Sequence, residues 1–396
     1  MTGPDAPSQP APPALPGPPP LPSAAPSAGR EAEPPASPSL AAELVRTRCR
    51  SCGSQLAFAP GTRALECVAC RARVEIVHGA GEAVDEHAYD AWLATGAAPV
   101  AHASGQALAC DGCGATTHGT DLSVACQFCG GHLVVAAPVD GVVEPEAVVP
   151  FAVAGDAARD AFRTWVRSRW FAPGALKRVG DTESLHGTYV PHWTFDADTT
   201  SQWSGQRGDA YYVTVGDGEN RRTERRVRWT PVAGTTRRAF DDVLVPASTL
   251  VPERDLDRLG PWRLERAAPY RPEYLAGYAT ARYDVDPPHG LERAKDEMAP
   301  VIRGDVELAI GGDEQRVHGI STAYAAVMFK LVLLPLWIAT YVYAGKQWQV
   351  MVNANTAEVV GQRPYSPWRI TLAVLAGLAV VAAVVVWYLT TQGSTG

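Results

Sequence analysis

The sequence lacks the marks of several common protein classes. No long apolar stretch follows Met1, so we expect no secretory signal peptide and cysteines that stay reduced. Positive charge is in the minority, with 35 Lys and Arg residues against 42 Asp and Glu residues and a net charge of -7. That balance excludes a uniformly basic nucleic-acid coat, although it permits a local basic patch. The 33 prolines and 36 glycines follow no three-residue period, which excludes a collagen-like chain.

A phosphate-binding loop is also missing. The pattern GxxxxGK[ST] does not occur, because the only Gly-Lys pair, Gly345-Lys346, is followed by Gln347. The tripeptide Asp85-Glu86-His87 is similar to a helicase box. Without the phosphate-binding loop, we nevertheless exclude an ATP-driven helicase.

Proline is abundant at the start of the chain. Residues 1–40 hold 14 of the 33 prolines, and Ala and Ser fill most of the other positions. Such a segment buries too little apolar surface to offset the entropy cost of ordering. We predict a disordered Pro/Ala-rich tail over 1–40 that serves as a solubilising tether; a docking arm for a proline-recognising partner is the alternative.

All cysteines of the chain fall in CxxC pairs. Each CxxC turn presents two thiolates on a tight knuckle, and two such knuckles supply the tetrahedral set that Zn²⁺ takes at structural sites. Fourteen residues separate the pairs of the first set, and twelve separate those of the second. We therefore predict two structural zinc ions as cofactors. Their predicted ligands are Cys49, Cys52, Cys67 and Cys70 for the first ion and Cys110, Cys113, Cys126 and Cys129 for the second.

Three other uses of these cysteines fit the pattern less well. Disulfides need an oxidising compartment, and a thioredoxin-like redox CxxC normally occurs alone on a βα turn. Iron–sulfur clusters use the same thiolates but usually at different spacing. Four thiolates also close the coordination shell of zinc, so we expect neither ion to be catalytic.

The cysteine spacing divides this part of the chain into small modules. We predict zinc ribbon 1 over 44–78, a helical linker over 79–105 and zinc ribbon 2 over 106–136. Ribbon 1 carries six arginines and two glutamates, whereas ribbon 2 has two aspartates and no Lys or Arg. Because phosphate binding depends on cations, ribbon 2 is unsuited to nucleic acid and ribbon 1 could bind it only weakly.

Residues 140–366 have the pattern of an α+β domain. A run of apolar residues at helical spacing predicts a helix over Asp156 to Trp170. Short alternating runs separated by turn residues follow it, and the segment from Leu336 to Val360 indicates a hairpin and a third strand. The fold class that we predict is α+β: two small zinc ribbons, then a mainly antiparallel β-rich domain, then a C-terminal transmembrane helix.

Two polar groups in this domain are candidate sites. His192, Asp196 and Asp198 share one face of a strand by parity, which suits an acid/base or metal site. No nucleophile accompanies them, so we favour ordinary hydrogen-bonding roles. A dense arginine run could contact anionic lipid or nucleic acid, although a solvated strand face is the commoner meaning. The run comprises Arg221, Arg222, Arg225, Arg226 and Arg228, with Arg237 and Arg238 further along.

The C-terminal segment has the pattern of a membrane anchor. From Ile370 to Leu389 there is no charged residue, and a helix of that length spans about 30 Å. Arg363 and Arg369 precede it, which by the positive-inside rule places the bulk of the chain in the cytoplasm. We predict a single-pass transmembrane helix over 368–390 in the cell membrane. A second span over 324–343 is the alternative, but it is interrupted by a lysine and a proline and would reverse the charge rule.

The order of these motifs resembles a family of bacterial membrane proteins with transcription factor IIB-type zinc ribbons, often labelled as similar to primosomal protein N-prime. The resemblance covers about 45–390. Beyond the two ribbons it depends on Tyr189-Val-Pro-His192-Trp-Thr-Phe-Asp196, Gly205-Gln-Arg-Gly-Asp209, Phe240-Asp-Asp-Val-Leu-Val245, Gly311-Gly-Asp313, Phe329-Lys-Leu-Val-Leu-Leu-Pro335-Leu-Trp337, Val352-Asn-Ala-Asn-Thr356 and Gln362-Arg-Pro-Tyr-Ser366. The resemblance implies an adaptor in membrane-stress or membrane-organisation complexes, with flotillin-like or phage-shock-type proteins as partners and no catalytic residues.

Together these observations predict a non-enzymatic adaptor or scaffold, tail-anchored on the cytoplasmic face of the bacterial membrane. Its expected partners are the lipid bilayer and other proteins. The alternative is a membrane-tethered nucleic-acid-binding protein that uses ribbon 1 and the arginine run. A third possibility, a hydrolase at His192 and Asp196, needs a pocket with a nucleophile.

Overall fold

The computed structural model describes residues 48–79, 81–95, 107–110, 116–118, 126, 133–135, 143–168, 185–343, 346–361 and 367–392. All of them belong to one unit of the chain, Leu44–Gly396. The predicted tail over 1–40 lies outside the described residues.

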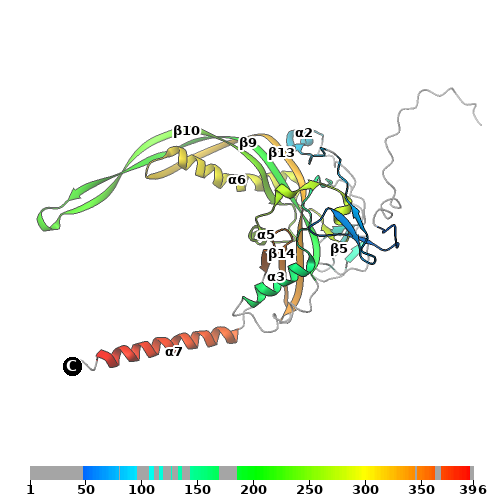
Figure 1. The fold of residues 1–396 in the computed structure, drawn as a ribbon. Coiled ribbons are helices and arrows are strands. Elements are labelled where there is room, and N and C mark those ends of the chain that lie inside the picture. The colour runs from blue at the N-terminus through cyan, green and yellow to red at the C-terminus, as the bar shows by residue number, and fades with distance from the viewer. Residues whose placement is uncertain are drawn as a thin grey trace, which may run out of the picture. The chain divides into compact units, whose positions relative to one another are not determined.

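Three long strands form the body of the unit. β9 (His186–Val215) pairs antiparallel with β10 (Arg222–Pro246) along one edge and with β13 (Glu314–Tyr343) along the other. The turn between β9 and β10 contains η1 (Gly218–Asn220). Figure 1 shows these strands curling together, with the β9–β10 hairpin extending past the end of β13. The mainly antiparallel sheet of the prediction is confirmed, but the short runs of the sequence are joined into single strands.

Two irregularities lie opposite the same point of β9. The β10 register shifts between Phe240 and Val243, and the β13 register shifts between Ala325 and Met328. Both shifts flank Asp196 and its neighbour, because Phe240 pairs with Ala197 and Met328 pairs with Asp196. Each bulge contains a residue with left-handed backbone, Asp242 at φ 53° and Ala326 at φ 49°. Bulges re-aim side chains next to them, and here they bring residues of three strands together.

One long helix covers a face of this sheet. α6 (Pro287–Ile310) begins at Asp286, whose carboxylate accepts a hydrogen bond from the His289 backbone N–H, and two prolines follow in the first turn. Its buried side chains recur every three or four residues and pack against β9, β10 and β13. Gly290 of this helix lies against the ring of Trp193, where a Cβ would come within 2.8 Å of the indole. The sequence needs glycine at this close approach.

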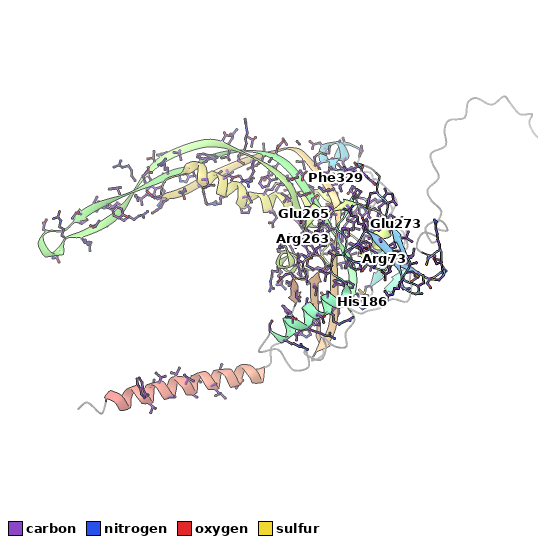
Figure 2. The ribbon with its side chains drawn as sticks, viewed as in Figure 1. Arg73, His186, Arg263, Glu265, Glu273 and Phe329 are labelled. Atoms are coloured by element: carbon purple, nitrogen blue, oxygen red, sulfur yellow. The ribbon has the colours of Figure 1, made fainter. Side chains whose placement is uncertain are left out.

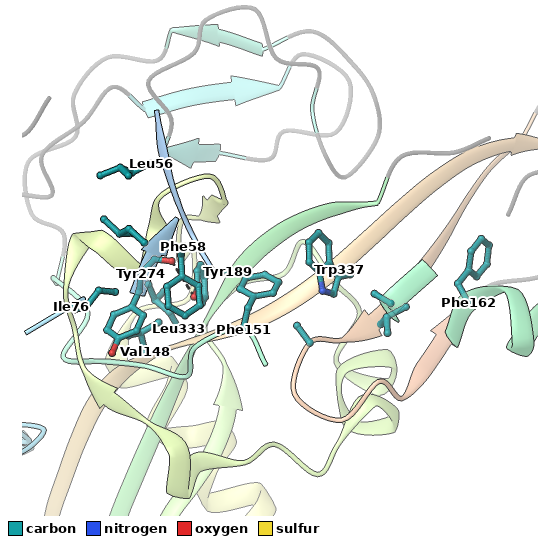
Figure 3. Packing of buried hydrophobic residues seen from close by; sticks show 14 of the residues in the cluster. Leu56, Phe58, Ile76, Val148, Phe151, Phe162, Tyr189, Tyr274, Leu333 and Trp337 are labelled. Carbon is teal, nitrogen blue, oxygen red and sulfur yellow. Dashed lines mark hydrogen bonds between the residues drawn. The ribbon is translucent and has the colours of Figure 1, made fainter. Parts of the chain in front are cut away.

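The remaining elements surround the other half of β9 and β13. β14 (Lys346–Asn353) and β15 (Val359–Gly361) extend the sheet beside β13, as the predicted hairpin and third strand require. The predicted helix is α3 (Gly155–Arg167), which buries Phe162 and Val166. A core of aromatic and aliphatic side chains holds these parts together, with Phe151 and Trp337 at its centre (Figure 3). The shorter elements are β8 (Ala147–Val148), α5 (Glu253–Leu259), η2 (Leu264–Arg266), β11 (Ala268–Pro269), η3 (Pro272–Leu275) and β12 (Ala279–Ala281).

The cysteine-bearing segments form small antiparallel hairpins. Ribbon 1 consists of β1 (Leu56–Phe58), β2 (Ala64–Cys67) and β3 (Arg73–Glu75), in the order β1-β2-β3. The second segment contributes β5 (Ala107–Cys110), β6 (Thr116–His118) and β7 (Leu133–Val135), and β6 pairs with β12 of the main sheet. Between them, β4 (His87–Ala88) pairs with β13, and α2 (Tyr89–Ala94) follows. The helical linker predicted over 79–105 is thus helical over one short stretch of its described part.

The structure corrects the prediction of a membrane anchor. α7 (Pro367–Gln392) is the helix at that position. Spanning a bilayer requires a helix that is both long and apolar throughout, and none of the described helices satisfies this requirement. The transmembrane helix over 368–390, and with it the single-pass assignment to the cell membrane, is therefore wrong. The alternative span over 324–343 lies in strand β13.

Candidate functional site

Two knuckles of ribbon 1 bring four cysteines together. In each knuckle the first cysteine carbonyl accepts a hydrogen bond from the residue four positions on, Gly53 for Cys49 and Arg71 for Cys67. Both donor residues have left-handed backbone, at φ 73° for Gly53 and φ 62° for Arg71. Glycine meets this demand without strain in the first knuckle, whereas an arginine adopts the same conformation in the second.

The four sulfurs have the spacing of a metal site. Cys49 Sγ lies 3.5 Å from Cys70 Sγ, and Cys52 Sγ lies 3.4 Å from Cys67 Sγ and 3.5 Å from Cys70 Sγ. A Zn–S bond of about 2.3 Å in tetrahedral geometry sets the sulfurs about 3.8 Å apart. The cluster of Cys49, Cys52, Cys67 and Cys70 can therefore hold a metal ion with little movement.

The proton affinities of these thiols reflect their crowding. Hydrogen bonds from Ser54 lower the pKa of Cys52 to about 6. For Cys70 a backbone hydrogen bond from Ala72 lowers the pKa, but contacts with the other three thiols outweigh it and raise the pKa to about 12. The set thus holds thiolate character and a retained proton at once, and metal binding would release that proton.

Ribbon 1 is attached to the β-rich domain along β1. The Phe58 backbone N–H donates to the Ala276 carbonyl at 2.8 Å, and the Phe58 ring lies 5.2 Å from that of Tyr274. His78 Nε2 lies 2.8 Å from the Tyr274 hydroxyl. Nearby, Arg271 forms an ion pair with Glu82 at 2.7 Å. These contacts join the ribbon that carries the cysteine cluster to the β-rich domain.

The second cysteine set is described only in part. Cys110 and Cys126 are buried in one apolar cluster with Leu256 and Leu259. Cys113 and Cys129 lie outside the described residues. The second predicted zinc site thus remains a prediction.

A second polar centre lies where the two bulges flank β9. Carboxylate oxygens of Glu86, Asp196 and Asp242 lie within 4.8 Å of one another. Lys330 Nζ donates to Glu86 Oε1 and to Asp242 Oδ1, both at 2.5 Å, and the lysine side chain is only 10% exposed. Asp196 Oδ1 accepts the Asp242 backbone N–H at 2.7 Å. We call these four residues the carboxylate–lysine cluster.

Three carboxylates share one ammonium group in this cluster. Burial raises the pKa of Asp196 to about 6, and the neighbouring Glu86 carboxylate adds to the rise. Burial lowers the pKa of Lys330, but its hydrogen bonds to Asp242 and Glu86 prevail and raise the pKa above the ordinary value. The lysine therefore stays charged while Asp196 gains and loses a proton near neutrality.

A histidine–glutamate pair adjoins the carboxylate–lysine cluster. His87 Nε2 lies 2.7 Å from Glu146 Oε1, and the other oxygen of Glu146 accepts the Leu331 backbone N–H at 2.6 Å. The hydrogen bond with Glu146 raises the pKa of His87. Glu86 and His87 thus connect β4 to the sheet through two adjacent side chains.

The structure separates the constellation predicted from strand parity. His192 is buried, with Nδ1 3.1 Å from the Val190 carbonyl and Nε2 without a hydrogen-bond partner among the described residues. Asp196 belongs to the carboxylate–lysine cluster, and Asp198 is exposed. Burial lowers the pKa of His192 to about 4, so it is neutral and offers no charge to a reaction at neutral pH. Within the described part of the chain no hydrogen bond or ion pair joins His192 to Asp196, and the hydrolase hypothesis gains no support.

Sequence reasoning missed Glu86, Asp242 and Lys330 as a group. Lys330 and Glu86 are 244 positions apart, and their meeting depends on both bulges. The one available signal was the lysine inside an apolar run at 329–337, because a charge in such a run needs a partner.

Three of the seven arginines of the run form ion pairs within the described part of the chain. Arg225 forms an ion pair with Glu314 at 2.6 Å, and Arg238 donates to both carboxylate oxygens of Asp305 at 2.9 Å. Arg226 pairs with Glu224 at 3.2 Å. These ion pairs offset part of the positive charge of the run, and Arg221, Arg222 and Arg237 are exposed.

Comparison with known proteins gives one match. The protein named "Uncharacterized protein YdjG" from Bacillus subtilis (strain 168) is 25% identical over 250 residues, which covers 61% of this chain and 70% of that protein. No family model matches the chain, and no solved structure does. The name of the Bacillus subtilis protein states no activity, so this similarity indicates no activity for this chain. The resemblance to the zinc-ribbon family stays a prediction.

Proposed function

We propose that this protein is a non-enzymatic adaptor that holds zinc at Cys49, Cys52, Cys67 and Cys70 and binds other proteins through ribbon 1. A second structural zinc at Cys110, Cys113, Cys126 and Cys129 belongs to the same proposal. Flotillin-like or phage-shock-type proteins are the first partners to test, because the family resemblance suggests them.

The observation that carries the proposal is the asymmetry of ribbon 1. Its β1 side is joined to the domain through Phe58 and Ala276, whereas β3 is exposed along its whole length. Within the described part of the chain, no strand pairs with the outer edge of β3. Val74 and Val77 on this side are 44% and 78% exposed. Arg73 of β3 is labelled in Figure 2.

The geometry of β3 shows which backbone groups are free for a partner strand. Leu65 pairs with Val74, and the Ile76 N–H donates back to the Arg63 carbonyl at 2.8 Å. In an antiparallel pair, backbone groups alternate between the partner and the outer edge. The N–H and C=O groups of Arg73 and Glu75 therefore point outward, where an extended segment of a partner can add a strand.

Four cysteines leave no open ligand position, which supports a structural rather than catalytic metal. The carboxylate–lysine cluster is closed by its own ion pairs, which supports a stabilising role. Both facts favour binding over catalysis.

Crosslinking in cells of the source organism tests this proposal. The tagged full-length protein should crosslink a defined set of proteins, and Val77→Glu should remove that set while zinc content by mass spectrometry stays unchanged. Val301→Glu is the matched control, because Val301 is 40% exposed on α6, away from ribbon 1. An unchanged set of crosslinked proteins for Val77→Glu would show that β3 is not the binding edge.

Nucleic-acid binding is the second candidate function. Arg48, Arg50 and Arg63 of ribbon 1 are exposed, which favours it. The candidate predicts that duplex affinity falls steeply with salt and drops further in an Arg50→Glu, Arg63→Glu variant. Fluorescence anisotropy that shows no salt dependence would remove it.

A further inference from the structure

The segment 81–95 connects ribbon 1 to the second cysteine set, and it crosses the main sheet on the way. Ala88 and His87 pair with Met328 and Phe329 of β13 over just two positions. So short a strand contributes little by itself, and side chains must supply most of the attachment.

Two kinds of side-chain contact hold this segment. The first is apolar: the Trp92 ring lies 5.3 Å from that of Phe329, and the Tyr89 ring lies 6.0 Å from it. Phe329 is labelled in Figure 2, below α2. The second kind is ionic, from Glu86 to Lys330, from His87 to Glu146 and, at the start of the segment, from Glu82 to Arg271. The contacts of Glu86 and His87 lie next to the two-residue strand, so we expect them to control its pairing.

We propose that segment 81–95 is a proton-sensitive latch, closed through Glu86 and His87 when the carboxylate–lysine cluster is protonated and released as it loses protons.

Glu86 is the only member of the cluster on the segment, and the other three are on β9, β10 and β13. When Asp196 carries a proton, the cluster has two negative charges against one positive charge on Lys330. When Asp196 is ionised, a third negative charge lies next to Glu86, and its repulsion acts across the contact between segment and sheet. Burial raises the pKa of Asp196, and this burial is relieved when the segment leaves the sheet. Asp196 therefore binds a proton more tightly when the segment is closed, and closing is coupled to proton uptake.

His87 acts in the same direction. Its ion pair with Glu146 exists only while the imidazole is protonated, and the hydrogen bond with Glu146 raises the pKa of His87. As the pH rises through the pKa of His87, the imidazole loses its proton and the ion pair between His87 and Glu146 becomes a neutral contact. Both groups therefore bind protons more tightly in the closed state, and their effects add.

Other charged groups face the segment but do not change the sign. Asp85 raises the pKa of His87, and Lys295 of α6 lies near Tyr89. The facing set is Glu82, Asp85 and Asp90 on the segment, Glu146 before β8, Asp196 on β9, Asp242 on β10, Arg271 before η3, Asp286, Glu292 and Lys295 at or on α6, and Lys330 on β13.

Amide hydrogen exchange on the full-length protein tests the latch. After correction for intrinsic exchange, opening of peptides within 82–95 should increase about tenfold between about pH 5 and about pH 8, since two partly exposed groups are linked to it. Peptides from α6 should show no such increase. Equal exchange of 82–95 at both pH values, or an equal increase in α6, would overturn the proposal.

Variants distinguish pH-dependent opening of segment 81–95 from a change in the stability of the whole protein. Asp196→Asn keeps the shape of the neutral acid, so most of the pH dependence within 82–95 should disappear, and His87→Gln should remove the remainder. Asp160→Asn on α3 is the matched control, because the Asp160 side chain is 74% exposed and forms an ion pair only with Arg163 among the described residues; it should behave as wild type. A pH profile of Asp196→Asn that matches the wild type would contradict the proposed latch.

Discussion

Two glycines of the same helix illustrate how single residues set the packing of this fold. A Cβ at Gly290 would come within 2.8 Å of the Trp193 ring, and Trp193 is fully buried. At Gly304 of α6 a Cβ would meet no atom within 4 Å. The first glycine is required by close packing, whereas the second only adds backbone freedom to the unfolded chain.

We therefore predict opposite effects for the same substitution at these positions. Gly290→Ala should lower the free energy of unfolding by about 1–3 kcal/mol, because the core is overpacked. Gly304→Ala should raise it by about 0.5–1 kcal/mol, because alanine favours helix. Urea denaturation followed by tryptophan fluorescence measures both. Equal effects at the two positions would contradict the packing at Trp193.

His192 makes the stability of the molecule sensitive to acid. Burial lowers its pKa to about 4 from an ordinary value near 6.5, so between these values the unfolded chain binds a proton that the folded chain does not. Stability is therefore present in full above about pH 6.5 and is lost as the pH falls toward 4, by about 3 kcal/mol at most. Asp196 has the opposite sign over an overlapping range.

Replacing His192 tests this term alone. His192→Leu should flatten the fall in the free energy of unfolding between about pH 6.5 and about pH 4. Denaturant titrations at several pH values measure it, with His318→Leu as control because that side chain is exposed. A slope in the His192→Leu protein like that of the wild type would show that the acid sensitivity has another source.

At the scale of residues, the sequence predicted the first cysteine cluster but not the carboxylate–lysine cluster. The four cysteines were predictable because each knuckle is local, with the ligands three positions apart and one hairpin between the pairs. Glu86, Asp196, Asp242 and Lys330 meet only after four segments pair in one register with two bulges. The alternation of side chains along a strand identified one face of β9. It could not identify the residues of the neighbouring strands that lie beside that face.

At the scale of elements, helices were easier to predict than strand lengths. The apolar period gave α3 closely, but Pro191, Gly205 and Gly208 made β9 look like several short strands. The structure tolerates Gly208 inside the strand because the ring of Trp229 lies over it, within 2.8 Å of where a Cβ would be. A cross-strand aromatic ring fills the space that glycine leaves, and no local pattern reveals it.

Removing the proposed zinc should affect ribbon 1 much more than the sheet. A ribbon of this size has little core of its own, and a structural zinc contributes on the order of 10 kcal/mol to folding such a unit. Cys67→Ser, or a strong chelator, should abolish exchange protection over 49–76 and leave α6 protected. Hydrogen exchange with a parallel zinc assay measures it. Full protection of 49–76 without metal would mean that the docking contacts of Phe58 suffice.

Pro231 is expected to guard the free edge of β10. Among the described residues this strand pairs only with β9. A proline on an edge strand removes one outward N–H that another chain could use. Pro231→Val should increase self-association, seen by sedimentation velocity. Ala233→Val is the control, since it adds the same side chain on the same side of the strand without adding an N–H. Equal association of both variants would assign the effect to hydrophobicity.

At the scale of the whole molecule, the mainly antiparallel β-rich fold was predictable, and the prediction of an anchor was wrong. The α+β class follows from alternating patterns and turns, and the structure agrees. The membrane prediction depended on an uncharged C-terminal run alone, and the described helices do not support it. Composition of one segment is a weaker guide than patterns that several segments must satisfy together.

The central position of β9 also has a consequence for biosynthesis. Its first neighbour, β10, follows directly along the chain, but its second neighbour, β13, is made about a hundred residues later. At about 5–20 residues per second, the ribosome needs on the order of ten seconds to supply that neighbour. During this interval one edge of the thirty-residue strand β9 is unpaired. Nascent chains on the same mRNA can then associate through these unpaired edges. Because strands this far apart in the sequence pair slowly, we expect this protein to need chaperones while it is being synthesised.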